Sequence, residues 1–350
     1  MPEITETELK AQIRRSDFSN FYFLYGEEKY MIANYARKLI AAAGGSTFET
    51  FNAQRLDGDS ADVDRIAAAA EALPFMAERK CVAVSDFNAG AVRAREAGKL
   101  EELLGTLPET TVLLFYLPTL SFDPKRDAGW KKFLTRANRA GCTVNVKKRT
   151  ADQLAKTLCS GAEKRGCTLS RGTAERIVSF CGDDLYTLFG ELEKLCAFVG
   201  SGEITRDTVD RIVVKNLETR VFDLSKAILA GNYSGAYTIL DQLLVQNEEP
   251  TAILAVLSSA YLDMYRVRVA VESGFGALEP AKHFDYARKE FRLRNAERDA
   301  KRFSTQTLRR SIGVLLEADT ALKSARGDRR LVMEKLIARL LLIAEKGKTA

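Results

Sequence analysis

The first 147 residues alternate between short apolar runs and stretches with helical spacing of apolar positions. Helical spacing marks residues 28–43, 62–72 and 100–105, and the glycines at 44 and 45 suit a helix end. The apolar runs predict strands at residues 21–25, 47–52, 81–84, 111–117 and 142–146. Strands that alternate with helices indicate an α/β domain built on a mostly parallel sheet covered on both faces.

Beyond residue 147 the strand pattern nearly disappears, and the spacing predicts helices. Helices are expected at residues 150–165, 171–181, 184–199 and 205–213, and then at 220–230, 234–246, 251–271, 304–324 and 328–344. Ser170 and Thr205 are suitable N-caps, and Pro250 suits a first helical turn. We therefore predict three domains: an α/β domain (1–147), a small helical domain (148–214) and a larger helical domain (215–350).

The composition removes several kinds of chemistry. The chain has 350 residues and a single histidine, His283, so a catalytic triad would depend on that residue and a two-histidine zinc site is impossible. We predict no catalytic residue, no metal site and no cofactor. Lys and Arg number 53 and Asp and Glu 47, a net charge of +6, which permits a nucleic-acid partner without requiring one.

Cysteine usage and hydropathy indicate the compartment. Six cysteines are scattered without a C-x-x-C pair, which favours reduced thiols in a cytosolic protein over a disulfide framework. The first residues lack the basic and apolar regions of a secretory signal, and the apolar stretches are too short to span a membrane. We expect a cytoplasmic protein.

The turn after the first predicted strand has the position of a phosphate-binding P-loop but not its residues. Such a loop needs G-x-x-x-x-G-K-[ST], which supplies backbone amides, a lysine and a hydroxyl for magnesium. Here Gly26 is followed by Glu27 and Glu28, and no Lys-Ser/Thr pair is present. Two carboxylates would repel a triphosphate, so we predict a degenerate P-loop that does not hydrolyse nucleotide.

The segment between the helix ending near residue 72 and the strand at residue 81 follows neither helical nor strand spacing. It reads Leu73-Pro74-Phe75-Met76 and continues to Lys80. In one interpretation its apolar side chains plug the bottom of the sheet. In the other they form an exposed wedge for a partner's pocket, because an aromatic side chain and a flexible methionine are good anchors.

Basic residues are concentrated near the C-terminal helices. Residues 285–310 contain nine Lys or Arg against four acids, a local charge of +5. Such a stretch is suited to track a phosphate backbone, but a solvated helical face has the same composition. The candidate DNA-facing residues are Arg292, Arg294, Arg298, Lys301 and Arg302.

Several motifs, taken in order, resemble those of the delta subunits of the bacterial DNA polymerase III clamp loader. The resemblance runs from about residue 18 to residue 345. It rests on segments 22–28, 73–80, 117–118, 182–195, 222–232 and 317–324, which read YFLYGEE, LPFMAERK, LP, GDDLYTLFGELEKL, FDLSKAILAGN and EADTALKS.

This resemblance implies an AAA+-like α/β domain, a helical lid, and a helical collar that joins a five-subunit ring. It implies that the chain binds the ring-shaped sliding clamp (the beta subunit) and holds it open, while other subunits hydrolyse ATP. The clamp-binding pair in the family corresponds to Phe75 and Met76, with Leu73 and Pro74 beside them and Glu78 and Arg79 orienting the turn. The implied partners are the tau/gamma and delta prime subunits and primed DNA, at the nucleoid.

Two other functions stay open at this point. An active P-loop ATPase acting on DNA would need the missing lysine and hydroxyl, and a stand-alone DNA-binding protein would use the basic helices without a partner protein. An enzyme activity is implied only by association, since such a subunit belongs to a DNA-directed DNA polymerase, a nucleotidyltransferase, without an active site of its own.

Overall fold

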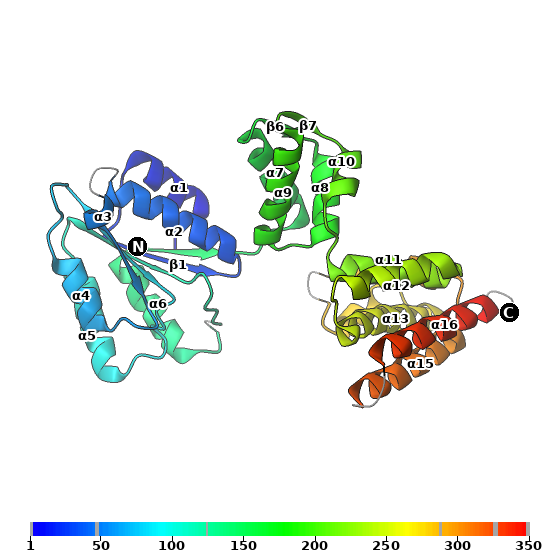
Figure 1. Cartoon of the computed structure of the whole chain (residues 1–350). Coiled ribbons are helices and arrows are strands. Elements are labelled where there is room, and N and C mark those ends of the chain that lie inside the picture. Colours follow the sequence, from blue (N-terminus) through cyan, green and yellow to red (C-terminus); the bar gives the residue numbers. More distant parts are fainter. Residues whose placement is uncertain (1–2, 46–48, 124, 287–288, 325–327, 348–350) are drawn as a thin grey trace. The chain divides into compact units, whose positions relative to one another are not determined.

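Two compact units make up the chain, residues 1–154 and residues 155–350. They are seen in a computed structural model that describes residues 3–45, 49–123, 125–286, 289–324 and 328–347. The boundary at residue 154 lies close to the predicted end of the α/β domain at residue 147, and the second unit contains the predicted collar and all but the first seven residues of the predicted lid. The division into three domains stays a prediction. Figure 1 labels most of the helices and some of the strands of each unit.

The first unit is built on a five-stranded parallel sheet. Its strands lie in the order β2-β3-β4-β1-β5, and every pair of neighbours is parallel. The predicted parallel α/β fold is therefore confirmed. The strand bounds are β1 (Phe21–Gly26), β2 (Ala53–Asp57), β3 (Lys80–Ser85), β4 (Thr111–Tyr116) and β5 (Cys142–Val146).

Helices cover both faces of this sheet (Figure 1). The central strands are apolar at consecutive positions because alternate side chains point to opposite faces and both faces are buried. Phe21 and Phe23 pack on one face, while Tyr22 and Leu24 pack on the other. The helices are α1 (Glu6–Arg15), α2 (Lys29–Gly44), α3 (Glu49–Asn52), α4 (Val63–Glu71), α5 (Ala94–Gly105) and α6 (Ala128–Ala140).

The strand predicted at residues 47–52 is wrong where the structure describes it. Residues 47 and 48 lie outside the described residues, and Glu49–Asn52 form the short helix α3, with strand β2 starting only at Ala53. The pattern was misleading because Phe51 is exposed, so its apolar side chain marks no buried strand face. Strand propensity is a weak guide, because the surroundings of a segment in the fold often outweigh it.

Helices dominate the second unit, as predicted, and β6 and β7 form a small parallel pair that the sequence pattern did not reveal. Each of these strands has only three residues, too few for a period of two to be recognised. The elements from the junction onward are α7 (Ala151–Glu163), β6 (Cys167–Leu169), α8 (Arg171–Cys181), α9 (Leu185–Val199), β7 (Gly202–Ile204), α10 (Arg206–Ile212), α11 (Leu217–Ala230), α12 (Tyr233–Val245), α13 (Pro250–Glu272), the 3-10 helix η1 (Glu279–Lys282), α14 (Glu290–Ala300), α15 (Thr305–Lys323) and α16 (Arg329–Gly347).

The predicted helix starts of this unit are confirmed by their caps. Ser170 accepts from the backbone N–H of Thr173, and Thr205 accepts from that of Thr208. Pro250 occupies the first turn of α13, where its missing N–H has no helical partner to lose.

The six cysteines are free thiols, and all but Cys159 are buried. Among the described residues, no helix combines the length and apolar content needed to cross a membrane.

A partly buried carboxylate fastens α1 to the rest of the first unit. Glu6 accepts hydrogen bonds from the hydroxyl of Tyr35 (2.6 Å) and from the guanidinium of Arg149 (2.9 Å). Burial by itself would raise the pKa of Glu6, but the bonds from Arg149 and Tyr35 outweigh it and hold this pKa below its ordinary value of 4.5. The carboxylate is therefore more acidic in the folded state than in the unfolded chain.

A pH-dependent contribution to stability follows from this shift. Because the folded pKa of Glu6 is depressed, its contribution is present above pH 4.5 and is lost as the pH falls through the lower, folded-state value. We expect Glu6→Gln to lower the urea midpoint of the α/β unit at about pH 7 and to have a smaller effect at about pH 3. Fluorescence of Trp130, the chain's single tryptophan, reports this unit. Glu71→Gln at an exposed position is the control, and an equal loss at both pH values would contradict the prediction.

Candidate functional site

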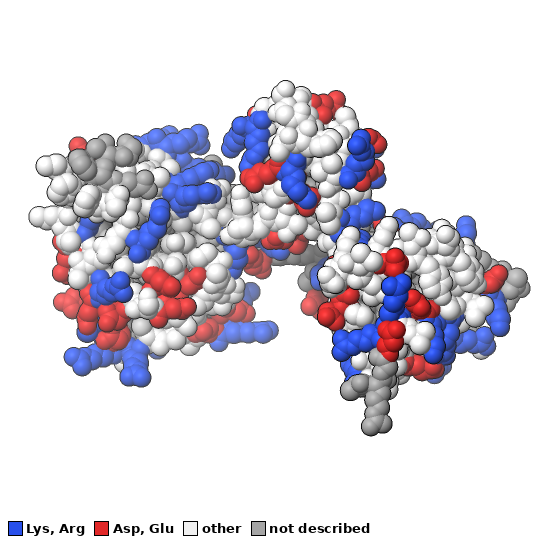
Figure 2. Space-filling model, in the orientation of Figure 1, with Lys and Arg blue, Asp and Glu red and all other residues white. Residues whose placement is uncertain are grey.

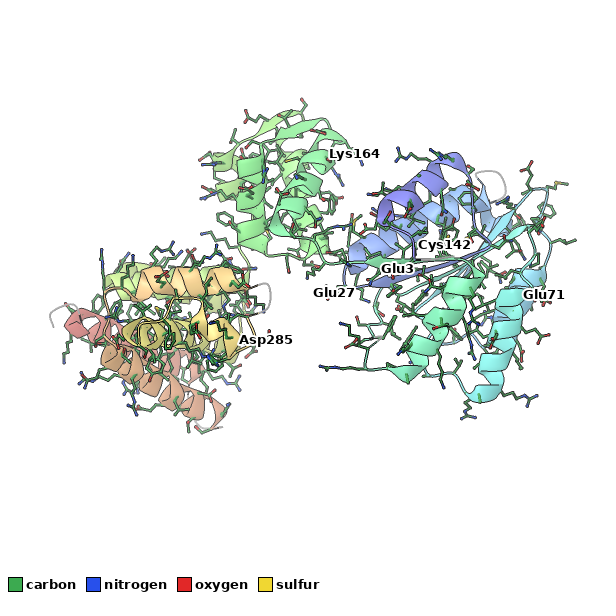
Figure 3. The ribbon with its side chains drawn as sticks, turned by 180° about the vertical axis from the view of Figure 1, so that it is seen from behind. Glu3, Glu27, Glu71, Cys142, Lys164 and Asp285 are labelled. Atoms are coloured by element: carbon green, nitrogen blue, oxygen red, sulfur yellow. The ribbon has the colours of Figure 1, made fainter. Side chains whose placement is uncertain are left out.

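The segment between α4 and β3 is an irregular turn whose two ends are held firmly. The carbonyl groups at the end of α4 need partners, since the last turn of a helix leaves them unpaired within it. Lys80 donates its ammonium to the carbonyl of Ala69, and Thr111 donates its hydroxyl to that of Ala70 (2.8 Å). Both donors are buried, and burial lowers the pKa of Lys80. Figure 3 labels Glu71, where the helix ends and the turn begins.

The middle of the turn is held by a residue from another element. Asn52, buried at the end of α3, donates its side-chain amide to the carbonyl of Phe75 (2.9 Å) and accepts from the backbone N–H of Phe75 (2.7 Å). The next residue, Met76, has a left-handed backbone with φ of +47°. A non-glycine residue in this region is uncommon and is kept there by surrounding contacts.

The apolar side chains of this turn point into solvent. Leu73 is 85% exposed, Met76 79% and Phe75 46%, and Pro74 is half-buried. The interpretation in which they plug the bottom of the sheet is therefore wrong. In Figure 2 the edge of the α/β unit beside α3 is largely uncharged. Apolar side chains gathered in one exposed place mark an interaction surface.

Of the two residues expected to orient the turn, one has a visible contact. Arg79 donates from its guanidinium to the backbone carbonyl of Phe18, at a long 3.5 Å. Glu78 is exposed. The shorter bonds that fix the turn come from Asn52, Lys80 and Thr111, so the orienting role predicted for Glu78 and Arg79 stays a prediction.

The turn after β1 has the shape of a P-loop connection but its amide groups are occupied. Gly26 has φ of +131°, and a Cβ at this position would lie 2.3 Å from the carbonyl oxygen of Val146, so only glycine fits. The same carbonyl accepts from the backbone N–H groups of Glu27 (3.0 Å) and Glu28 (3.1 Å). Figure 3 labels Glu27 at this turn. A phosphate would find these two amides already bonded and two carboxylates beside them.

The lysine next to this turn also serves the protein's own backbone. Lys29 donates its ammonium to the carbonyl groups of Leu117 (3.2 Å) and Leu120. Burial lowers the pKa of Lys29, because the charged form loses hydration. These contacts tie the start of α2 to the loop after β4. The geometry fits the predicted degenerate P-loop.

The basic stretch of the second unit contains one residue that does not belong on its surface. Arg294, Arg298, Lys301 and Arg302 are exposed on and just after α14, and Arg298 pairs with Asp299 (3.1 Å). Their exposure leaves the DNA-facing surface possible as a proposal.

Arg292 is the exception. The sequence placed it among the DNA-facing residues, and the structure corrects this. Its side chain is 18% exposed and its guanidinium pairs with the buried Asp263 (2.8 Å). It donates further to the hydroxyl of Ser259. The sequence could not separate it from its neighbours, because a basic residue on the inner side of a helix has the same charge as one outside.

Sequence reasoning also missed two residues at the exposed turn, Phe51 and Asn52. Phe51 is 66% exposed, and its ring lies 5.1 Å from that of Phe75. Both were assigned to a strand, and nothing local in the chain signals a contact with a segment 23 residues away.

Within the described residues no three His, Cys, Asp or Glu side chains are grouped as a metal site would need.

The fold places a parallel α/β sheet, with a glycine turn after its first strand, before a series of helices. Comparison with known families agrees along most of the chain. Residues 22–147 match the family model described as DNA polymerase III, delta subunit, and residues 218–340 match that of the delta subunit's C-terminal domain. The chain belongs to the DNA polymerase III delta subunit family, as its motifs indicated.

Individual relatives are similar over long stretches. DNA polymerase III subunit delta of Bacillus subtilis (strain 168) is 26% identical over 342 residues, 96% of each chain. A probable DNA polymerase III subunit delta of Aquifex aeolicus (strain VF5) is 23% identical over 261 residues, 72% of each chain. The solved Bacillus subtilis DNA clamp loader delta protein superposes with a TM-score of 0.62 at 25% identity, covering 96% of this chain and 99% of that one. The general role that follows is that of a clamp-loader delta subunit in DNA replication.

Proposed function

We propose that this chain binds a ring-shaped sliding clamp through the exposed turn at residues 73–76 and holds one interface of the ring open. The observation that carries the proposal is the exposure of Leu73, Phe75 and Met76 on a turn whose backbone is fixed at both ends and in the middle. Three exposed apolar side chains cost solubility in an isolated protein, so a fixed display of them favours a partner with an apolar pocket.

Opening a ring requires that the subunit bind the open ring more tightly than the closed one. A ligand shifts an equilibrium only by its difference in affinity for the two states. Two anchors worth about 2 kcal/mol each, if engaged fully only in the open ring, supply a shift of a few kcal/mol. This is a large change for an interface that favours closure, and it needs no covalent chemistry from this chain.

The blocked turn after β1 supports a division of labour within the loader. We propose that this chain contributes binding energy, while the tau/gamma subunits hydrolyse ATP and, with the delta prime subunit, complete the five-subunit ring. The support is the use of the Glu27 and Glu28 amides and of Lys29 in internal hydrogen bonds. The proposed place of action is primed DNA in the cytoplasm, at the nucleoid.

The direct test is a titration of the purified full-length chain with the sliding clamp of the same organism, followed by surface plasmon resonance. Saturable one-to-one binding is expected. Opening is then followed with fluorophores across a clamp interface, whose separation should increase when the chain is added. Failure to bind the clamp at any concentration up to the limit of solubility would overturn the proposal.

For DNA we propose that the exposed basic residues Arg294, Arg298, Lys301 and Arg302 face the phosphate backbone within the loader. Each phosphate contact releases counterions, so each contributes about 0.9 to the slope of log affinity against log salt. We expect Lys301→Ala with Arg302→Ala to reduce this slope by about 2 in the assembled loader on primed DNA. Lys131→Ala with Lys132→Ala, an exposed pair on α6, is the matched control. An unchanged slope would assign the stretch to a solvated helical face.

A further inference from the structure

The exposed turn is not the whole of the apolar surface at this end of the sheet. Phe51 on α3 is 66% exposed, and its ring centroid lies 5.1 Å from that of Phe75 with the ring planes tilted by 35°. Aromatic rings at this distance are in favourable contact. Phe75 keeps 46% of its surface exposed, so the two rings together form one apolar surface drawn from two separate segments.

The residue next to Phe51 controls the shape of the turn. Asn52 is 1% exposed, and its side-chain amide donates to the carbonyl of Phe75 and accepts from its N–H. A primary amide can do both at once, whereas an aspartate only accepts and an alanine does neither. Phe75 lies in an irregular segment, so its backbone N–H and carbonyl are paired by the Asn52 side chain instead of by a neighbouring strand. The next residue is Met76, with its left-handed backbone.

A turn held in this way loses little freedom on binding. Ordering a flexible segment at the moment of binding subtracts from affinity, and a segment already in its bound shape avoids that loss. The buried Asn52 therefore has a consequence for recognition as well as for folding. Phe51, in contrast, is mostly exposed and is not one of the buried residues of the core.

From these contacts we infer that α3 is part of the clamp-binding element. Phe51 is a fourth docking side chain beside Leu73, Phe75 and Met76, and Asn52 is a positioning residue that keeps the turn in its binding shape. The inference rests on the proposed function, since it assigns these residues to the same partner. The partner chemistry it requires is an apolar pocket wide enough for two neighbouring aromatic rings.

The test compares Phe51→Ala, Asn52→Ala and Asn52→Asp in the full-length chain with the unchanged protein, with clamp affinity and hydrogen exchange of residues 72–79 as readouts. Phe51→Ala is expected to weaken clamp binding about tenfold and to leave exchange unchanged. Asn52→Ala is expected to weaken binding at least as much and to speed exchange at the Phe75 amide. Asn52→Asp retains the acceptor for that amide and should restore its protection in part, along with part of the affinity.

Phe198→Ala is the matched control, since Phe198 is a 57% exposed phenylalanine on α9. If Phe75→Ala abolishes binding while Phe51→Ala and Asn52→Ala keep the original affinity, the inference is wrong and the proposed function survives. If Phe75→Ala also binds normally, the proposed function itself fails. Tighter binding by Phe51→Ala would assign Phe51 to shielding Phe75, and loss of affinity in Asn52→Ala with unchanged exchange would remove the positioning role. Trp130 fluorescence confirms that the α/β unit of the Phe51, Asn52 and Phe75 variants is folded, and far-ultraviolet circular dichroism does so for Phe198→Ala in the second unit.

Discussion

Replacing Phe75 with alanine and Met76 with glycine in one chain is expected to weaken clamp binding between about 30-fold and about 1,000-fold. In the proposed complex the exposed surface of each of these large apolar side chains becomes buried, and such anchors are worth about 2 kcal/mol or more each. The lower figure applies if the two losses overlap, because effects of neighbouring anchors are not additive. Surface plasmon resonance with immobilised clamp measures the change.

Glycine is chosen at position 76 because of the backbone. Met76 has φ of +47°, a conformation that costs a residue with a Cβ about 1–2 kcal/mol and glycine almost nothing. The substitution therefore removes the side chain without straining the turn, and the thermal stability of the variant should match or exceed that of the original chain. Phe198→Ala again serves as control. A double variant with unchanged affinity would exclude residues 75 and 76 as the binding site.

Replacing Asp263 with alanine is expected to destabilise the helical unit by about 3–5 kcal/mol, the usual cost of leaving one member of a buried ion pair without its partner. Asp263 is 3% exposed and accepts from Arg292 (2.9 Å) and from the hydroxyl of Tyr286 (2.5 Å). Burial and the bond to Asp263 raise the pKa of Tyr286, so this hydroxyl stays a donor. Without the carboxylate, the largely buried guanidinium of Arg292 and the buried hydroxyl of Tyr286 both lose an acceptor.

Two probes separate this effect from general unfolding. The urea transition followed by far-ultraviolet circular dichroism should shift for the helical unit, whereas Trp130 fluorescence, which reports the α/β unit, should keep its midpoint. Asp319→Ala removes an exposed partner of Lys323 (2.7 Å) and is expected to cost less than about 1 kcal/mol. Equal effects of the two substitutions would show that the Asp263 cluster contributes no more than a surface pair.

Much of the architecture could be predicted because it follows from local chemistry. The run Phe21–Tyr25 is apolar at every position, which is what a strand covered on both faces requires, and β1 forms there. Ser170 and Thr205 mark helix starts because a hydroxyl satisfies a free backbone N–H wherever the fold places the helix. The order of the family's motifs along the chain likewise needed no coordinates.

The sequence-based predictions were wrong where a residue's role depends on partners far away along the chain. Arg292 has the charge of its neighbours, and only its position against Asp263 on α13 makes it an internal residue. Residues 49–52 form a helix rather than a strand, and the side chain of Asn52 bonds to the backbone of Phe75, 23 residues further along. A stretch of sequence as short as one helix or strand does not contain both Asn52 and Phe75.

The amino-acid pattern was enough to predict an α/β domain followed by helices, a P-loop that lacks its lysine and hydroxyl, and the resemblance to the delta subunit family. The sequence left open whether Leu73, Phe75 and Met76 lie in the core or on the surface. Their spacing is neither that of a helix nor that of a strand, so it does not show which side chains are buried. The tertiary structure decided this by placing them in solvent on a turn fixed by Asn52, Lys80 and Thr111. Exposure is a property of the packed chain, and so the proposed binding surface could be recognised only in the folded structure.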